Sequence, residues 1–341
     1  MLFCFSNPWS YSVRLDNRCV RCHFLAVALE KFEQLRALLR SYRSCLVAYS
    51  GGVDSVFLAR VARDVLGGKS LAVIADSASL PRRELAEALD VADKFQIPVR
   101  VVRTQEFDNP SYTANPVNRC YFCKHELFTE LEPIAKAEGF AVIAYGENAS
   151  DIGDFRPGAQ AAKEFQVRAP LKEVGLTKSE IRELSAQLGL PTADKPQMAC
   201  LSSRIPHGEV VSPEKLKMIE AAENVLKDVG FYDVRVRHHE LRSAEFGVRN
   251  ENRTVSGVQN SAPNTPNSAL HLARIEVGAT ELPKLLESGT AARVAEALKK
   301  LGYAHVTLDL QGYRRGSLNE TAASRITEHA SREESKVKHD A

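Results

Sequence analysis

The sequence predicts an α/β fold in which a domain built on a parallel sheet precedes a smaller α+β domain. Between residues 25 and 207, short apolar runs alternate with helical patterns, and after residue 208 the order changes to helix, strand, strand, helix and strand. Alternating strands and helices are typical of a parallel sheet, whose ligands lie at the carboxyl ends of the strands. With 341 residues, 44% of them apolar, the chain is long enough to bury two cores.

The first domain is expected over residues 25–207. Apolar residues recur at helical spacing from residue 26 to residue 42 and lead into a short apolar run at residues 45–49. That run predicts the first buried strand of a sheet. Further strands are expected at 70–76, 98–103 and 141–145, and further helices at 56–62, 81–95 and 178–188.

The second domain is expected over residues 208–320, because the composition changes at Pro206-His207-Gly208. Its predicted helices are 213–229 and 290–301, and its predicted strands are 233–239, 270–277 and 304–309. Polar residues with glycine and proline predict a loop insert at 243–268, and a charged tail follows at 321–341. Residues 1–24 are expected to form a poorly ordered N-terminal extension.

Charge and cysteine content limit the class of protein. A net charge of +2 gives no basic field of the kind that nucleic-acid binders use, so we expect no nucleic-acid partner. The first residues lack a basic segment and a run long enough to span a bilayer, which predicts a cytoplasmic protein without a membrane contact. Seven cysteines are an odd number and too few for a disulfide scaffold, so grouped cysteines favour metal binding or catalysis.

A glycine turn follows the first predicted strand, in the segment Ser50-Gly51-Gly52-Val53-Asp54-Ser55. Two glycines allow the backbone to turn sharply and to approach a ligand, and the next helix offers unpaired N–H groups to a phosphate. Asp54 is placed either to cap that helix or to contact Mg²⁺ bound to the phosphates. The segment lacks the lysine of a Walker loop and resembles the PP-loop of ATP pyrophosphatases, which implies ATP binding and the transfer of AMP to a substrate oxygen.

Other strand ends are expected to complete the ATP site. Asp76 ends the second predicted strand, and Gly146 follows the fourth. In the PP-loop superfamily the second strand end contacts the adenosine, and a segment like Gly146-Glu147-Asn148-Ala149-Ser150-Asp151 completes the pocket. The alternative is that Asn148 and Asp151 only cap the following turn.

Three cysteines, Cys120, Cys123 and Cys200, are candidates for metal binding or for sulfur chemistry. Cys120 and Cys123 are three residues apart, at the predicted start of a helix, where two thiolates can face one metal. The helix N-terminus and adjacent bases are expected to lower the pKa of both thiols, and Arg204 and Lys195 are expected to favour the thiolate of Cys200. The alternatives for Cys120 and Cys123 are two inert buried residues, a redox pair or half a zinc site, and the alternative for Cys200 is an inert core residue.

Together these segments resemble the ATP-dependent sacrificial sulfur transferase family, LarE. The resemblance rests on the PP-loop, on Asn118-Arg119-Cys120-Tyr121-Phe122-Cys123-Lys124 and on Ala199-Cys200-Leu201-Ser202-Ser203-Arg204-Ile205-Pro206-His207-Gly208. It extends from about residue 32 to residue 319 and includes Asp154-Phe155-Arg156-Pro157-Gly158 and the segment 309–320. The family implies biosynthesis of the nickel-pincer nucleotide cofactor in a homo-oligomeric enzyme.

The resemblance implies a reaction in two steps. Each carboxylate of a pyridinium biscarboxylic acid mononucleotide is adenylated with ATP, and sulfur then displaces AMP to leave a thiocarboxylate. In single-cysteine members the residue that matches Cys200 gives up its own sulfur and becomes dehydroalanine. Because this chain also has Cys120 and Cys123, it matches the three-cysteine branch, in which the three thiolates hold a [4Fe–4S] cluster that can bind a transferable sulfide. We favour the cluster, and the sulfur donor stays unknown.

Substrate binding requires cations. Arg235 and Arg237 lie two residues apart on one predicted strand, and the family resemblance assigns them to the substrate phosphate, with Glu276 nearby. The alternative is a solvated strand face. Cys45 is expected in the core, whereas Cys4, Cys19 and Cys22 lie in the N-terminal extension, where the pair Cys19 and Cys22 is the alternative metal site.

Three other functions are compatible with some of these features. A tRNA thiolation enzyme also combines a PP-loop with cysteines on a cluster, although it needs a basic surface for RNA. A synthetase that passes ammonia to an adenylate would leave the cysteines incidental. A regulator that binds nucleotide or cluster without turnover would release no pyrophosphate.

Overall fold

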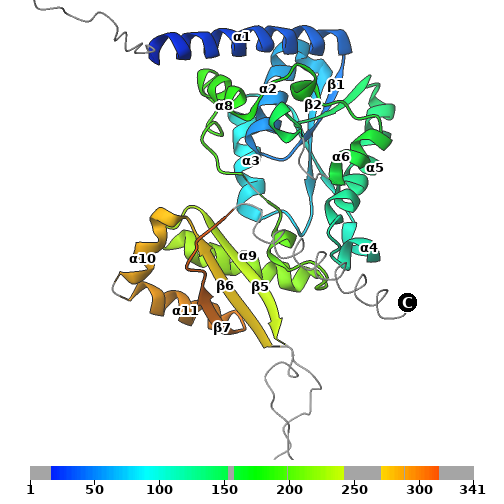
Figure 1. The fold of residues 1–341 in the computed structure, drawn as a ribbon. Helices are drawn as coiled ribbons and strands as arrows, with labels where there is room; N and C mark the ends of the chain where they lie inside the picture. Colours follow the sequence, from blue (N-terminus) through cyan, green and yellow to red (C-terminus); the bar gives the residue numbers. More distant parts are fainter. Residues whose placement is uncertain (1–16, 153–156, 198, 242–269, 288, 315–341) are drawn as a thin grey trace, which may run out of the picture.

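The computed structural model describes residues 17–152, 157–197, 199–241, 270–287 and 289–314, with side chains from residue 24 onward. Two sheets form the molecule, and Figure 1 shows the larger one beneath the long helix α1 and the smaller one below it. The predicted insert 243–268, the tail 321–341, Cys4 and the segment Asp154-Phe155-Arg156 lie outside the described residues.

The larger sheet is wholly parallel and has the order β3-β2-β1-β4. Because β1 has β2 on one side and β4 on the other, the strand order reverses beside β1, where open α/β sheets bind their ligands. Its strands are β1 (Cys45–Tyr49), β2 (Ser70–Asp76), β3 (Val99–Arg103) and β4 (Val142–Tyr145).

Helices cover both faces of this sheet. Alternate residues of β1 face opposite sides: Cys45 and Val47 join the core under α1, α2 and α3, whereas Leu46 and Ala48 pack with α5 and α6. Both sides are apolar, so nearly every residue of β1 is buried. The helices of this half are α1 (Asn17–Tyr42), α2 (Val53–Leu66), α3 (Arg82–Lys94), α4 (Pro110–Thr113), α5 (Arg119–Glu138), α6 (Pro157–Glu164), α7 (Pro170–Glu173) and α8 (Lys178–Gln187).

The smaller sheet has the order β5-β6-β7, with β5 antiparallel and β7 parallel to β6. Its strands are β5 (Val234–Leu241), β6 (Leu270–Val277) and β7 (Tyr303–Leu308), and its helices are α9 (Pro213–Asp228), α10 (Leu282–Leu286) and α11 (Thr290–Lys300). One face packs on α9 and α11 through a separate apolar cluster. Short 3₁₀ turns complete the chain at Gly67–Lys69, Glu106–Asp108, Ala149–Asp151, Leu201–Arg204 and Ala279–Glu281.

The predicted fold class is confirmed, and the strands lie within two residues of their expected bounds. One boundary is wrong: α1 begins at Asn17, nine residues before the predicted start. Residues 17–42 contain neither proline nor glycine, so nothing in the sequence stops the helix earlier. The helix therefore includes the end of the segment that we assigned to an extension, whereas the division into domains stays a proposal.

Candidate active site

A cavity of about 330 Å³ opens at the carboxyl end of the parallel sheet, beside the point where the strand order reverses. The residues that line it come from the ends of β1 and β4, from the glycine turn and the start of α2, and from α5 and α6. Its predicted members are Ser50, Gly52, Asp54, Ser55, Cys120 and Gly146, and the others are Ala48, Tyr49, Lys124, Leu127, Tyr145, Glu147, Pro157, Gly158 and Ala159.

The glycine turn is held in a conformation that only small residues tolerate. Gly51 has φ +71°, and a Cβ on it would lie 2.5 Å from the Cβ of Ala88. The Ser55 hydroxyl accepts from the Ser50 N–H at 3.1 Å and donates to the Gly52 carbonyl at 3.0 Å. Gly52 is the N-cap of α2, so the start of this helix lines the cavity. Backbone N–H groups at such a position suit an anion.

Asp54 does not cap α2, because Gly52 holds that position without a side-chain hydrogen bond. Its Oδ2 accepts from Lys178 Nζ at 2.5 Å, whereas its buried Oδ1 has no hydrogen-bond partner among the described residues. Burial raises the pKa of the Asp54 carboxyl, and Lys178 opposes part of that effect. One oxygen of Asp54 is therefore held by an ammonium group, and the other lacks a cation or a donor.

Other predicted ATP contacts lie beside the cavity without lining it: Gly51, Val53, Asp76, Asn148 and Asp151. Asn148 and Asp151 form a capping box, in which the Asn148 side chain accepts from the Ser150 N–H and Asp151 accepts from the Asn148 N–H. The observed hydrogen bonds of Asn148 and Asp151 are therefore those expected if the two residues cap the turn. Asp76 pairs with Arg82 at the end of β2.

One guanidinium group acts electrostatically on Cys120, Cys123 and Cys200. Arg119 is buried, and its Nη2 lies 3.9 Å from the Cys200 Sγ. Burial alone would lower the pKa of Arg119, but the electrostatic effects of Cys200, Cys120 and Cys123 raise it above its ordinary value. A buried positive charge thus lies beside Cys200 and acts on all three cysteines.

The expected lowering of both thiol pKa values is wrong for Cys123. Burial raises the pKa of its thiol, and Cys200 and Glu106 add to that effect. The cause is the apolar surroundings, which outweigh Lys124 and the start of the helix. Cys120 is exposed, and Cys123 and Cys200 are partly exposed.

The loop of Cys200 is anchored to both halves of the molecule. Leu201 donates its N–H to the Ser79 carbonyl at 2.8 Å, and the hydroxyls of Ser79, Tyr112 and Ser202 are hydrogen-bonded to one another within 3.1 Å. These residues are buried and join the end of β2 to α4 and to the cysteine loop. The position of Cys200 is therefore fixed by the tertiary structure rather than by its neighbours in sequence.

The cations that we expected beside Cys200 act differently. Arg204 donates to the carbonyls of Ala199 and Cys200 and forms a buried bidentate pair with Glu223, at 2.8 and 3.1 Å. It therefore holds the backbone of the loop. Lys195 pairs with Glu84 at 2.8 Å and with Glu87 at 2.9 Å, so its charge is committed to α3.

Arg235 and Arg237 lie on the same face of β5 and are buried, so the alternative of a solvated strand face is wrong. Arg235 donates to the Gln197 carbonyl at 3.0 Å, and Arg237 donates to the Ser203 carbonyl at 2.8 Å. Glu276 accepts from Arg237 at 2.8 Å. The structure thus brings this arginine pair against the loop of Cys200.

Three residues of the site escaped the sequence analysis as functional groups: Lys178, Lys124 and Arg119. Lys178 reaches Asp54 from α8, 124 residues away, and no pattern in the sequence links the two. Arg119 and Lys124 flank the two cysteines of α5, and this position is the sequence feature that could have identified them.

The described helices include no segment that is both long and apolar enough to span a bilayer. No protein-family model matches the chain. An uncharacterized protein of Synechocystis is 40% identical over 289 residues, which are 85% of this chain and 97% of that protein. The pyridinium-3,5-bisthiocarboxylic acid mononucleotide synthase of Lactiplantibacillus plantarum is 29% identical over 298 residues, 87% of this chain and 96% of that enzyme.

A more distant relative is the tRNA-specific 2-thiouridylase of Azorhizobium caulinodans, 31% identical over 248 residues, which are 60% of this chain and 62% of that enzyme. With the parallel sheet and the glycine turn, these relatives define the class as a PP-loop protein of the ATP pyrophosphatase type. Within that class the chain belongs to the LarE family. It is an ATP-dependent transferase related to the sulfur transferases of this class.

Proposed function

We propose that the protein adenylates the carboxylates of a pyridinium biscarboxylic acid mononucleotide with ATP and converts them to thiocarboxylates. A carboxylate oxygen attacks the α-phosphorus of ATP and pyrophosphate leaves. A sulfur nucleophile then attacks the acyl carbon and AMP leaves, so that one C–O bond is replaced by one C–S bond. This is a step of nickel-pincer nucleotide biosynthesis.

The observation that carries the proposal is the shared cavity. The glycine turn and Cys120, the first of the three candidate cysteines, line the same cavity. An acyl adenylate reacts with water unless the nucleophile is close, so the two half-reactions require one enclosed site. Gly146 packs so closely on the start of α2 that a Cβ on it would lie 3.0 Å from the Ser55 nitrogen.

Mg²⁺ fits Asp54 in this proposal. The buried Oδ1 has no hydrogen-bond partner among the described residues, and a carboxylate oxygen is a ligand that Mg²⁺ prefers. Lys178, on the other oxygen of Asp54, is available to meet phosphate charge when the nucleotide enters. The residues Ser50, Gly51, Gly52, Val53 and Ser55 would surround the phosphates, with Asp76, Gly146, Asn148 and Asp151 around the rest of the nucleotide.

A [4Fe–4S] cluster fits the donor set of Cys120, Cys123 and Cys200. Each of the three acts electrostatically on the same buried Arg119, whose charge would offset that of three thiolates. Three thiolates leave one iron open to an exogenous sulfide, which is the chemistry that the cluster would supply. The alternative within the proposal is that Cys200 donates its own sulfur.

Arg235 and Arg237 would hold the substrate phosphate next to the cysteine loop, with Glu276 nearby. The guanidinium groups of the two arginines now donate to the backbone carbonyls of residues 197 and 203, and a phosphate oxygen would replace those acceptors. Glu276 is 1% exposed and holds Arg237 in place. We further propose a cytoplasmic homo-oligomer with an insert at 243–268.

The test is the release of pyrophosphate and AMP from ATP, with and without the biscarboxylic acid mononucleotide, after anaerobic reconstitution with iron and sulfide. We expect release that depends on the substrate, and a thiocarboxylate product found by mass spectrometry. A matched pair is Cys200→Ala, which should form adenylate without thiocarboxylate, and Cys45→Ala, whose buried thiol lies outside the site and should leave the products unchanged.

Four outcomes would contradict parts of the proposal. If Cys200 loses the mass of one sulfur atom after turnover, the sulfur comes from this cysteine and not from a cluster. Turnover that requires tRNA and falls steeply with salt assigns the protein to tRNA thiolation, and full activity of a Cys120→Ala, Cys123→Ala, Cys200→Ala triple variant with ammonia assigns it to an amide synthetase. ATP binding without any pyrophosphate release assigns it to regulation.

A further inference from the structure

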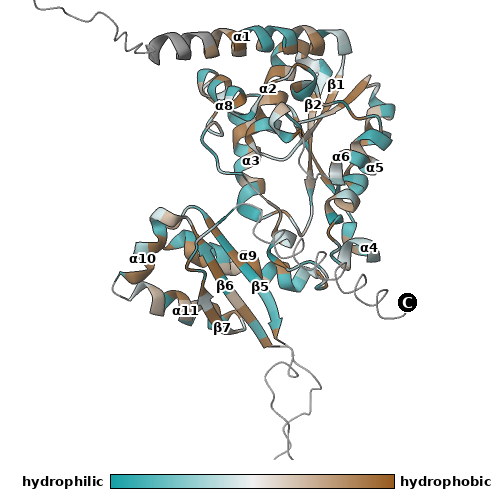
Figure 2. Ribbon diagram, in the orientation of Figure 1, coloured by the Kyte–Doolittle hydropathy of each residue, from teal (hydrophilic) through white to brown (hydrophobic). Residues whose placement is uncertain are grey.

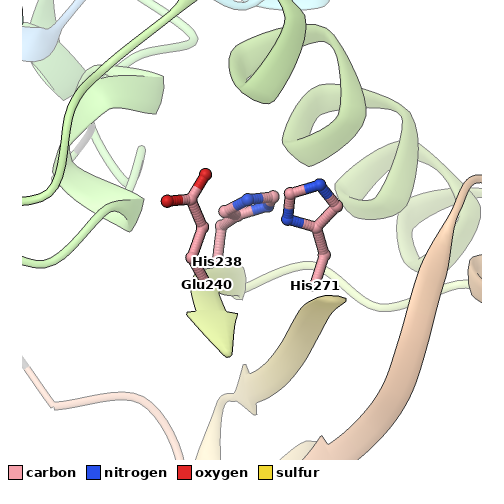
Figure 3. Close-up of side chains that lie close together, drawn as sticks. All are labelled: His238, Glu240 and His271. Carbon is pink, nitrogen blue, oxygen red and sulfur yellow. The ribbon is translucent and has the colours of Figure 1, made fainter. Parts of the chain in front are cut away.

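A second group of metal-ligand side chains lies in the smaller sheet, outside the cavity and away from the cysteines. His238, Glu240 and His271 each offer one ligand atom, and these atoms all lie within 4.8 Å of one another. Figure 3 shows the two imidazole rings beside each other, His238 and Glu240 coming from one strand and His271 from its neighbour. Among the described residues, this is the one set of three or more such groups that meets so closely.

The strand register explains why these side chains meet. His238 and Glu240 are two residues apart on β5, so they share one face of the sheet. His271 of β6 is directly opposite Glu240 in the antiparallel ladder and diagonal to His238, so it points to the same face. This face is the one packed on α9 and α11, whereas Arg235 and Arg237 occupy the other. The group thus lies on the opposite face of the sheet from Arg235 and Arg237.

Two imidazole nitrogens in this group are buried and have no hydrogen-bond partner within the described part of the chain. They are His238 Nε2 and His271 Nδ1. His238 is 0% exposed, and its other nitrogen, Nδ1, lies 3.2 Å from the Tyr303 hydroxyl. When Nδ1 carries the proton and donates to Tyr303, Nε2 presents its lone pair to the group. A buried nitrogen without a partner is costly, and a bound cation would satisfy it.

The charge of the group comes from one carboxylate, which already has a cationic partner. Glu240 is the carboxylate of the set, and Lys215 of α9 lies 2.8 Å from it, so an ammonium group now balances that charge. Lys215 also donates to the Val210 carbonyl at 2.6 Å, which gives the ammonium a second partner when it leaves Glu240. Burial and the neighbouring His271 and Lys215 lower the pKa of His238 to about 4, so the ring is neutral at pH 7.

We propose that His238, Glu240 and His271 bind one divalent metal ion of the zinc class. Two imidazoles and one carboxylate are a ligand set that zinc uses when it keeps a fourth position for water, whereas Mg²⁺ and Ca²⁺ prefer oxygen ligands alone. Ligand atoms at tetrahedral zinc are roughly 3.4 Å apart, given bonds of 2.0–2.2 Å, so the three side chains must close by about 1 Å. The ion would join β5 to β6 at the last described pairs of their ladder.

The first test is a titration of the metal-free full chain with Zn²⁺ and Co²⁺. A site of nitrogen and oxygen ligands binds Co²⁺ without the sulfur-to-cobalt charge-transfer band that cysteine sites produce, so the spectrum separates this site from the thiols. We expect one equivalent of such Co²⁺. Its affinity should fall by at least about 100-fold in His238→Ala and His271→Ala, since even the loss of a supporting group costs 10–100-fold.

Two further variants distinguish the loss of a metal ligand from a loss of folding. Glu240→Gln preserves the size of the side chain and should still weaken the site, with an unchanged circular dichroism spectrum. His239→Ala is the matched control, because His239 lies on the same strand and its side chain lies near Arg274, Arg237 and Glu276 on the opposite face. It should bind the ion as the unmodified chain does.

Lys215→Ala gives the sharpest prediction, because it removes the ammonium group that competes with the ion. We expect Zn²⁺ to bind several-fold more tightly in this variant. The proposal is overturned if all bound Co²⁺ shows the sulfur band, if His238→Ala and Glu240→Gln both bind the ion as tightly as the unmodified chain, or if Lys215→Ala loses the site.

Discussion

The two sheets of this protein place their ionisable residues in opposite ways. In the parallel sheet the central strand β1 is apolar and buried on both faces, and the polar residues begin where the strands end. In the smaller sheet Arg235, Arg237 and His238 are themselves buried within a strand. Figure 2 shows the contrast, since the C-terminal part of β5 is teal.

This difference predicts different responses to mutation. Polar residues at the end of a parallel strand lie outside the apolar core, so they are free to serve a ligand at little cost in stability. Buried charges within a strand must stay paired, because an uncompensated charge in the interior is strongly destabilising. We therefore expect substitutions of the buried ionisable residues around the smaller sheet to lower the free energy of unfolding more than substitutions at the strand ends of the larger sheet.

The largest effect is expected at the buried pair Arg204 and Glu223, whose side chains are both 3% exposed. Arg204→Met leaves a buried carboxylate without its partner and should lower the free energy of unfolding by about 3–5 kcal/mol. Urea denaturation followed by circular dichroism measures it. The control is Arg83→Met, which removes an exposed pair with Asp228 and should cost about 0–1 kcal/mol. Equal losses in the two variants would contradict the expected difference between buried and exposed charges.

The second effect tests an exception in the larger sheet. Gly51→Ala adds a Cβ at φ +71° that lies 2.5 Å from the Ala88 Cβ, so we expect a loss of about 2–4 kcal/mol from backbone strain and overpacking. Gly139→Ala is the control, because Gly139 has φ +71° in the left-handed helical region with open space around it and should lose only about 1–2 kcal/mol. Thermal denaturation of both variants checks the difference, and a Gly51→Ala protein as stable as Gly139→Ala would contradict the close packing of the turn.

A third effect is a dependence of stability on pH. Burial would raise the pKa of Glu223, but Arg204 and the Val236 N–H outweigh burial and hold it below its ordinary value. A lowered carboxyl pKa stabilises the folded state above the ordinary pKa of about 4.5, and this stabilisation is lost as the pH falls through the folded pKa.

The measurement is the free energy of unfolding between pH 7 and pH 3. In the double variant Arg204→Met, Glu223→Leu this part of the acid sensitivity should be absent. An identical pH dependence in the double variant and the unmodified chain would show that other groups cause the loss.

The smallest effect on stability is expected at the cavity, where activity should respond instead. Asp54→Asn retains the shape of the side chain and removes the charge that Lys178 contacts, so the free energy of unfolding should change by about 1 kcal/mol or less. Release of pyrophosphate should fall by at least about tenfold, because Mg²⁺ loses a ligand. Asp64→Asn, on the exposed side of the same helix, should change neither quantity much. An active Asp54→Asn enzyme would remove Asp54 from the site.

Much of the fold could be predicted from patterns along the chain. Apolar runs bounded by glycine turns identified β1, β2 and β4, because buried parallel strands leave a strong local signal. The start of α1 was missed, since residues 17–25 carry no stop signal and no clear helical period. The PP-loop was recognisable because its function depends on consecutive residues.

By itself, the sequence determined the class of fold, the glycine turn at residues 50–55 and the family, all of which depend on neighbouring residues. Only the tertiary structure decided which distant side chains meet. Lys178 contacts Asp54 across 124 residues, Arg119 lies beside Cys200 across 81 residues, and His271 joins His238 and Glu240 through the ladder register. Contacts of this kind arise from the packing of whole elements, and packing leaves no fixed spacing in the chain.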